Sequence, residues 1–191
     1  MAPISFGNFS DGFLQELADY LDGRRVLEIF AGNGLLASKL ARLGVPVTAT
    51  SLLTGHDGHE FGMHHEVLEL DALQAVRRFG DDSEVLLMSW PTVTDQATRA
   101  ALEWRSERPI VFVGEYANGS TGHYGGTATD LFFQVTEEHR RFTRYIQRSV
   151  LEFAAVLHAK TEYVDYWRSS RGLPPATQAP LSVASEAGRE Q

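Results

Sequence analysis

A turn with two glycines follows an apolar run near the start of the chain. The segment consists of Val26-Leu27-Glu28-Ile29-Phe30-Ala31-Gly32-Asn33-Gly34-Leu35-Leu36-Ala37. Glycine lets a backbone approach a ligand closely, and the first turn of a helix carries N–H groups that have no partner inside the helix. The pattern predicts a site for a nucleotide-like ligand at this turn. A tight strand-to-helix turn that binds no ligand is the structural alternative.

Dinucleotides are one class of ligand that such a turn can hold. The spacing Gly32-x-Gly34-x-x-Ala37 matches the fingerprint G-x-G-x-x-G/A. That fingerprint also needs an acidic residue about 20 positions further on, which holds the ribose hydroxyls. This chain has Ser51 there, so an NAD-dependent oxidoreductase rests on the glycine spacing alone.

The order of motifs resembles that of the class I methyltransferase family, which uses S-adenosylmethionine. Glu28 stands where that family has an acid before its glycine-rich turn, and Asp71 stands at the end of the expected third strand. The resemblance implies that Glu28 faces the amino group of the methionine moiety and that Asp71 accepts a hydrogen bond from the adenine amino group. It covers residues 25–115 and implies these cofactor-binding residues: Glu28, Phe30, Ala31, Gly32, Asn33, Gly34, Ser51, Leu52, Asp71, Ala72, Ser89 and Trp90.

Two positions depart from the family pattern. Phe30 replaces the first glycine of the turn, as in the D-L-F-A-G-x-G pattern of the DNA cytosine C5 methyltransferases, and Ser51 replaces the acid that grips the ribose. A neutral serine hydroxyl makes a weaker hydrogen bond than a carboxylate, although Asp57 is close enough in sequence to substitute. The alternative is therefore a methyltransferase-like protein that only binds a ligand or performs a non-methylating reaction such as a cyclisation.

Composition limits the acceptor of the methyl group. The 191 residues include no cysteine, which excludes the cysteine nucleophile of the cytosine C5 enzymes. Ser89-Trp90-Pro91-Thr92 departs from the [N/D/S]-P-P-[Y/F] motif of the amino methyltransferases that act on adenine or glutamine. The formal net charge of -8 disfavours a nucleic-acid partner. We expect a small-molecule acceptor, with Trp90 either stacking in its pocket or filling a strand-to-helix junction.

A glycine-rich segment, residues 114–126, follows the fifth apolar run and is expected to overhang the site as a lid. Its candidate catalytic residues are Glu115, Tyr116 and His123, which could remove a proton from the acceptor. The alternative is a surface loop whose polar residues are solvated. His56 and His59 have a loose spacing in a second glycine-rich stretch, and no metal site is expected there.

Alternating strand and helix patterns predict the elements that position these residues. Apolar runs at 25–30, 45–50, 67–70, 84–88 and 109–113 predict five parallel strands, and helical spacing fills the segments between them. Ser10 or Asp11 is expected to cap a helix that runs to Leu21 and is closed by Gly23.

The last third is expected to add a helix from Asp130 to Phe142 and an antiparallel pair of strands at 142–147 and 161–167. The predicted fold is α/β: a three-layer sandwich with a seven-stranded, mostly parallel sheet and a C-terminal antiparallel hairpin. Residues 1–172 are expected to form a single domain and residues 173–191 a disordered tail. The absence of a signal peptide or membrane span predicts a cytoplasmic protein. We further expect a monomer or homodimer.

Overall fold

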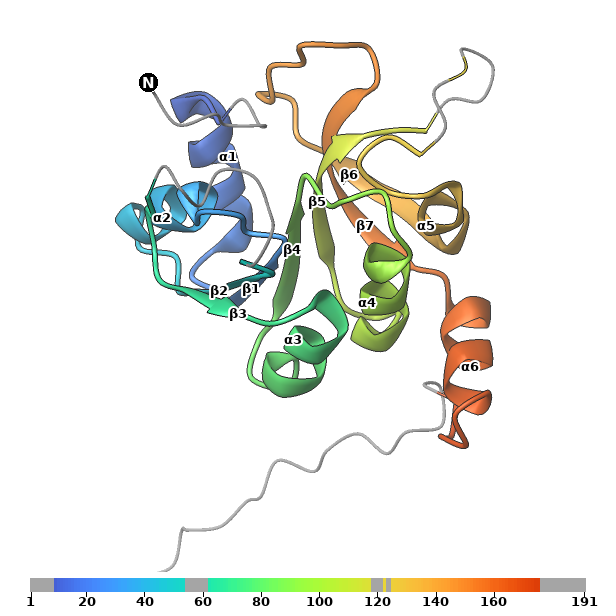
Figure 1. Cartoon of the computed structure of the whole chain (residues 1–191). Helices are drawn as coiled ribbons and strands as arrows, with labels where there is room; N and C mark the ends of the chain where they lie inside the picture. Colours follow the sequence, from blue (N-terminus) through green and yellow to red (C-terminus); the bar gives the residue numbers. More distant parts are fainter. Residues whose placement is uncertain (1–8, 54–61, 118–121, 123–124, 176–191) are drawn as a thin grey trace, which may run out of the picture.

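The computed structural model describes residues 9–53, 62–117, 122 and 125–175. Within them, seven strands form one sheet in the order β3-β2-β1-β4-β5-β7-β6 (Figure 1). The strands are β1 (Val26–Ile29), β2 (Val47–Ser51), β3 (Val67–Glu69), β4 (Val85–Ser89), β5 (Ile110–Glu115), β6 (Thr136–Arg141) and β7 (Glu152–Ala159). The pairings from β3 to β5 are parallel, and β7 runs antiparallel to both β5 and β6. The predicted seven-stranded sheet is confirmed.

Helices cover both faces of this sheet, which gives the predicted three layers (Figure 1). One apolar cluster joins α1 and α2 to one face, and another joins α3, α4 and α5 to the other. A smaller cluster holds α6 against α4 and α5. The helices are α1 (Asp11–Leu21), α2 (Leu35–Arg42), α3 (Ala72–Phe79), α4 (Gln96–Trp104), α5 (Asp130–Val135) and α6 (Thr161–Ser169).

Local sequence explains the boundaries of α1. The Ser10 hydroxyl accepts a hydrogen bond from the Phe13 N–H at 3.3 Å, which caps the first turn. Asp22 adopts a left-handed conformation at the other end, with φ of 47°, and Gly23 follows with φ of 72°. Buried apolar side chains recur every three or four residues between these ends, at Phe13, Leu14, Leu17 and Leu21.

The positions predicted for the helix and the two strands of the last third were wrong. The expected helix 130–142 stops at Val135, and its second half is β6. That strand buries only Thr136 because it lies at the edge of the sheet, so it shows no apolar alternation. Residues 142–147 are not a strand either: Phe142 and Tyr145 pack with Phe13 of α1.

The second strand of the antiparallel pair lies earlier than predicted. It is β7, an interior strand with a nearly continuous apolar run. Residues 161–167, expected as a strand, belong to α6. Their apolar contacts come from Tyr163, Val164 and Trp167, a helical spacing that packs on Leu102 and Val135.

The parallel strands all end at one edge of the sheet, and this carboxyl edge gathers the predicted site residues. The strand order turns back between β1 and β4, because β2 and β3 lie on one side of β1 while β4 and β5 lie on the other. Ligands of open α/β sheets bind outside the carboxyl ends at such a switch point. Glu115 of β5 pairs in register with Glu152 of β7, so the start of β7 lies at the same edge.

Candidate functional site

The turn after β1 offers one open glycine. Gly32 has φ of +56°, and among the described residues no atom lies within 4 Å of the place where its Cβ would be. A left-handed φ with open space beside it suits a backbone that a ligand approaches closely. The Gly32 N–H donates to the Ser51 hydroxyl at 3.3 Å, which ties the turn to the end of β2.

Gly34 lies where the turn packs closely against another segment of the chain. A Cβ at this position would lie 2.8 Å from the Cβ of His65 and 3.0 Å from Cγ2 of Val67. The Asn33 carbonyl accepts a hydrogen bond from the His64 N–H at 2.8 Å, so the segment before β3 lies against the turn. Gly34 makes room for the chain itself.

Two aromatic residues adopt left-handed backbone conformations at the ends of neighbouring strands. Phe30 follows β1 with φ of 61°, and Trp90 follows β4 with φ of 51°. Because β1 and β4 pair in parallel, both residues lie at the carboxyl edge. Such conformations cost bulky residues about 1–2 kcal/mol each and concentrate at functional sites.

Glu28 is a buried carboxyl group beneath the glycine turn. Its side chain is 1% exposed, and its Oε2 has no hydrogen-bond partner among the described residues. Burial raises its pKa to about 8, while a hydrogen bond from the Ala37 N–H acts in the opposite direction. This N–H belongs to the first turns of α2, so the carboxyl group uses one donor of that helix end.

The ends of β2 and β3 hold the next predicted residues. The Ser51 hydroxyl is engaged by Gly32, and the neighbouring Leu52 side chain is 44% exposed. Asp71 caps α3: its Oδ1 accepts the Gln74 N–H at 2.8 Å. Ala72, the first residue of α3, is buried. Asp71 is therefore both a structural cap and a carboxylate at the carboxyl edge.

Trp90 joins the end of β4 to the loop before β7. The buried indole Nε1 of Trp90 has no hydrogen-bond partner in the described residues. The Arg148 guanidinium lies 5.2 Å from the indole ring, a cation–π contact. Glu152, which is 3% exposed, accepts hydrogen bonds from the N–H and Nε of Arg148 at 2.9 and 3.1 Å. Ser89, before Trp90, is also buried.

Glu115 and Tyr116 end β5 but have different surroundings. Glu115 is partly exposed and lies opposite Glu152 in the sheet. The Tyr116 hydroxyl donates to Glu138 Oε2 at 3.1 Å and accepts from Arg141 at 2.9 Å. Burial raises the pKa of this phenol, with the Glu138 carboxylate also raising it and Arg141 lowering it. The single proton of the Tyr116 hydroxyl is thus already donated to Glu138.

Some predicted residues lie outside the described part of the chain. These are His123 of the glycine-rich segment and the residues His56, Asp57 and His59 that follow β2. In the ranges that the structure describes, no group of three or more His, Asp or Glu side chains could hold a metal ion. Within the same ranges, no helix is long and apolar enough to cross a membrane.

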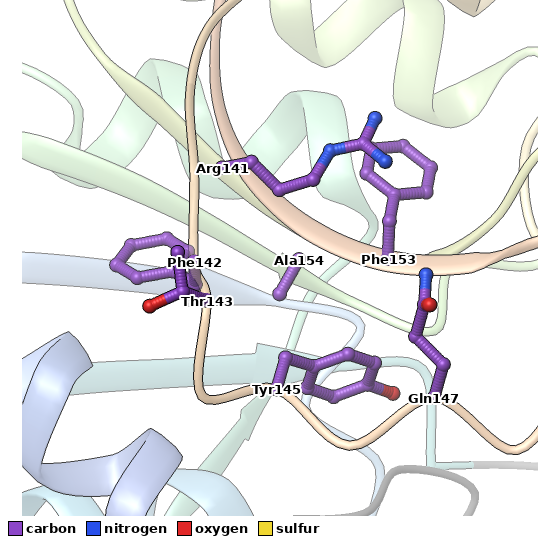
Figure 2. A pocket seen from close by; sticks show the side chains of 7 residues that line it. All are labelled: Arg141, Phe142, Thr143, Tyr145, Gln147, Phe153 and Ala154. Atoms are coloured by element: carbon purple, nitrogen blue, oxygen red, sulfur yellow. The ribbon is translucent and has the colours of Figure 1, made fainter.

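Sequence reasoning missed a cavity between the loop 141–147 and the start of β7. Figure 2 shows its walls, and its volume is about 330 Å³. The lining residues are Arg141, Phe142, Thr143, Tyr145, Gln147, Phe153 and Ala154. One sequence feature marks this region. Residues 140–148 contain four arginines and no acid, in a chain of net charge -8.

Comparisons with known proteins identify the fold but no close relative. No protein-family model matches the sequence, and no curated protein matches it. A structure solved in work on the conversion of a disulfide bond into a thioacetal group during echinomycin biosynthesis has a TM-score of 0.52 at 16% identity, over 89% of this chain and 90% of that chain.

Two further structures show the same likeness. Magnesium protoporphyrin IX methyltransferase from Synechocystis PCC 6803, with bound S-adenosylhomocysteine, has a TM-score of 0.50 at 12% identity, over 77% of this chain and 82% of that chain. A protein in the NADB-Rossmann superfamily from Streptococcus agalactiae has a TM-score of 0.51 at 14% identity, over 81% of this chain and 71% of that chain.

Strand order distinguishes between the two kinds of Rossmann-like sheet. The dinucleotide-binding fold has the parallel order 3-2-1-4-5-6, whereas an antiparallel β7 lies beside β5 in this chain. That closing antiparallel pair is the arrangement that the resemblance to methyltransferases implies. The chain has the Rossmann-like fold of the class I methyltransferases.

Proposed function

We propose that this chain, with its class I methyltransferase fold, binds S-adenosylmethionine at the carboxyl edge of the sheet and catalyses methyl transfer to a small-molecule acceptor. The structural neighbour from Synechocystis carries S-adenosylhomocysteine, the product of this cofactor. The fold alone does not choose between cofactors, since a neighbour of the NADB-Rossmann superfamily matches equally well. The residues at the carboxyl edge favour S-adenosylmethionine.

The buried carboxyl group of Glu28 is the observation that carries the proposal. A dinucleotide would bring its pyrophosphate to the N-terminus of α2 and would need the N–H groups there. Glu28 already uses the Ala37 N–H and places an acidic group beneath the turn. A pyrophosphate would be repelled by that group once it ionised, whereas the ammonium and sulfonium of S-adenosylmethionine would be attracted.

The other residues of the edge fit the same ligand in part. The open side of Gly32 would admit the methionine moiety against the backbone. Asp71 uses Oδ1 to cap α3, and a carboxylate retains further acceptor positions for the adenine amino group. The Ser51 hydroxyl, held by Gly32, would be a weak partner for the ribose. We propose Leu52, Ala72 and Ser89 as additional contacts.

The chemistry supplied by the bound cofactor is an activated methyl group on a sulfonium, which is displaced in line by the acceptor atom. The chain itself would position the acceptor and accept its proton. Glu115, at the end of β5, is the proposed proton acceptor, and Tyr116, whose hydroxyl is held by Glu138 and Arg141, is proposed to position the acceptor. Trp90 would form a wall between the two ligands.

A second candidate function keeps the cofactor site and drops methyl transfer. Ser51 favours it, because a neutral hydroxyl that already accepts the Gly32 N–H would hold the ribose more weakly than the usual acid. Such a protein would bind S-adenosylmethionine weakly and use the site for binding or for another reaction, such as a cyclisation.

Calorimetry on the full chain tests the proposal. S-adenosylmethionine and S-adenosylhomocysteine should bind with dissociation constants below 1 mM, and Glu28→Gln should weaken the binding of both by about ten-fold through loss of a charged partner. Arg99→Gln, an exposed change on α4, is the matched control. Absence of binding to a folded chain, or a larger thermal shift with NADH than with S-adenosylmethionine, would overturn the proposal.

Turnover separates the two candidates. Release of S-adenosylhomocysteine in the presence of a small-molecule acceptor supports methyl transfer. Cofactor binding without release over a broad acceptor panel supports the second candidate instead.

A further inference from the structure

The Glu28 carboxyl group has one engaged oxygen and one unengaged oxygen in the described part of the chain. Glu28 lies in β1 two residues after Val26, so both side chains point to the face that α1 and α2 cover. The carboxyl group accepts the Ala37 N–H of α2, while its Oε2 has no partner among the described residues. A buried polar atom without a partner is costly and uncommon. Its place at the switch point of the sheet points to a ligand group that binds there.

The surroundings of Glu28 favour a neutral carboxyl group. Its neighbours in the two adjacent strands are Ala49 of β2 and Leu87 of β4. The side chains that α1 and α2 bury are all apolar: Phe13, Leu14, Leu17, Leu21, Leu36, Ala37 and Leu40. In the described part of the chain, no buried cation of these elements balances a negative charge on Glu28, and burial raises its pKa to about 8. The free protein therefore keeps this proton at pH 7.

Two histidines lie near the same turn. The His64 N–H donates to the Asn33 carbonyl at 2.8 Å, and a Cβ on Gly34 would lie 2.8 Å from the Cβ of His65. Histidine is a residue type that changes its charge near neutral pH, and a protonated imidazole would repel a cationic ligand. The source of any pH dependence of binding is therefore identified with variants of both Glu28 and His65.

We infer that an S-adenosyl ligand with a free ammonium group binds at this turn in exchange for one proton of Glu28. This inference rests on the proposed function. The O–H bond of the Glu28 carboxyl group breaks, its electron pair stays on the carboxylate, and the proton leaves to the solvent. The ammonium keeps its own protons and donates one of them to Oε2. The exchange is favoured because opposite charges attract more strongly in apolar surroundings than across water.

This exchange makes the affinity for the ligand depend on pH in a defined direction. Below about pH 8 the free protein holds a proton that the bound protein lacks, so binding strengthens by up to about ten-fold for each unit of pH rise. Above about pH 8 the free carboxyl group is already ionised, and the dependence disappears. Occupancy of the site would thus respond to pH across the neutral range.

Calorimetric titration of the full chain with S-adenosylhomocysteine, which carries the ammonium but no sulfonium, tests the exchange. The affinity of the wild type should rise by at least about ten-fold between pH 6 and pH 8. At pH 7, titrations in phosphate and in Tris, whose heats of ionisation differ, should report the release of more than about half a proton for each ligand bound.

Two variants and a second ligand assign the proton. Glu28→Gln should change its affinity by less than about three-fold between pH 6 and pH 8 and should release no proton, since it has none to lose. His65→Gln is the matched control at the same turn and should keep the rise seen in the wild type. The ligand 5′-methylthioadenosine, which lacks the ammonium, should bind the wild type equally at both pH values.

The possible failures are distinguishable. Equal wild-type affinity for S-adenosylhomocysteine at both pH values, the same rise in Glu28→Gln, or loss of the rise in His65→Gln would overturn the inference and leave the proposed function in place. An equal rise with 5′-methylthioadenosine would do the same, and this arm needs no variant to fold. S-adenosylhomocysteine that does not bind the folded chain even at pH 8 would overturn the proposed function and the inference with it.

Discussion

Residues at the carboxyl edge have two kinds of environment, and burial separates them. Glu28 is enclosed and keeps its proton at neutral pH because its pKa is raised to about 8. Asp71 and Glu115 are partly exposed side chains near the ends of β3 and β5, on either side of β1. One edge therefore combines a protonated acid beneath the turn with carboxylates beside it, and a cationic ligand would shift the first group toward its ionised form.

Glu28 makes stability depend on pH in a defined direction. The native state keeps the Glu28 proton up to about pH 8, whereas the unfolded chain releases it near pH 4.5. The free energy of unfolding therefore falls as the pH rises from 4.5 to about 8. Glu28→Gln removes this dependence. The unfolding free energy of the variant minus that of the wild type should rise by about 3–4 kcal/mol as the pH increases from 5 to 8.5. Urea denaturation at both pH values measures it. Parallel pH profiles of the two proteins would contradict the assignment.

At the scale of elements, the site is assembled by contacts between segments that are not neighbours in the chain. The turn after β1 lies against the segment before β3 through Gly34 and His65. The loop before β7 reaches the end of β4 through Arg148 and Trp90. Each contact fixes a loop of the carboxyl edge against a strand end, which is what a binding site needs for a defined shape.

Substitution of Gly34 tests the first contact. Gly34→Ala combines a strained φ of +76° with a Cβ placed 2.8 Å from His65, so we expect a loss of about 3 kcal/mol in unfolding free energy. Gly44→Ala is the matched control, because Gly44 has a similar φ of +82° but no described side chain or backbone atom within 4 Å of the added Cβ. It should cost only about 1 kcal/mol. Equal losses would show that the segment before β3 moves away easily.

Substitution of Arg148 tests the second contact. Arg148→Ala leaves the buried Glu152 carboxylate without its cation and should lower the free energy of unfolding by about 1–2 kcal/mol, less than for a fully buried pair because Arg148 is half exposed. Adding Glu152→Gln should recover part of the loss. Arg99→Ala breaks an exposed pair with Asp95 and should change stability by less than about 0.5 kcal/mol. Denaturant titration of the variants decides between these values.

At the scale of the whole molecule, one sheet joins the cofactor side and the proposed acceptor side. The glycine turn lies at β1, and Glu115 lies at the end of β5, on the far side of β4. Helices α1 to α5 pack on the two faces of the sheet, and α6 packs on α4 and α5. We propose that residues 1–172 fold as a single domain that contains both sides.

Truncation tests this extent. A chain that ends at Pro175 keeps the contact of Arg168 with the Pro174 carbonyl, and its melting temperature should stay within about 2 °C of the full chain. A chain that ends at Lys160 loses Val164 and uncovers Leu102 and Val135, so it should melt at least 8 °C lower, since this uncovers a buried cluster. Differential scanning calorimetry measures both. A large loss in the longer chain would contradict the proposed domain boundary.

Local patterns in the sequence determined the first two thirds of the fold. The run from Val26 to Ala37 contains a strand, a glycine turn and a helix start within twelve residues, so neighbouring residues alone specify that unit. The same holds for the Ser10 cap of α1 and for the five parallel strands. The position of Glu28 within β1, just before the turn, follows from this register, and the candidate cofactor residues follow from the strand ends.

Tertiary structure decided the rest. Strand β6 is polar because its place at the sheet edge demands no burial, and the spacing of Phe142 and Tyr145 reflects Phe13, over 120 residues earlier. Burial raises the pKa of Glu28 to about 8, and the pairing of β5 with β7 places Glu115 opposite Glu152. The cavity exists only where the loop 141–147 meets β7. Sequence fixes local preferences, but burial and long-range pairing are properties of the packed chain.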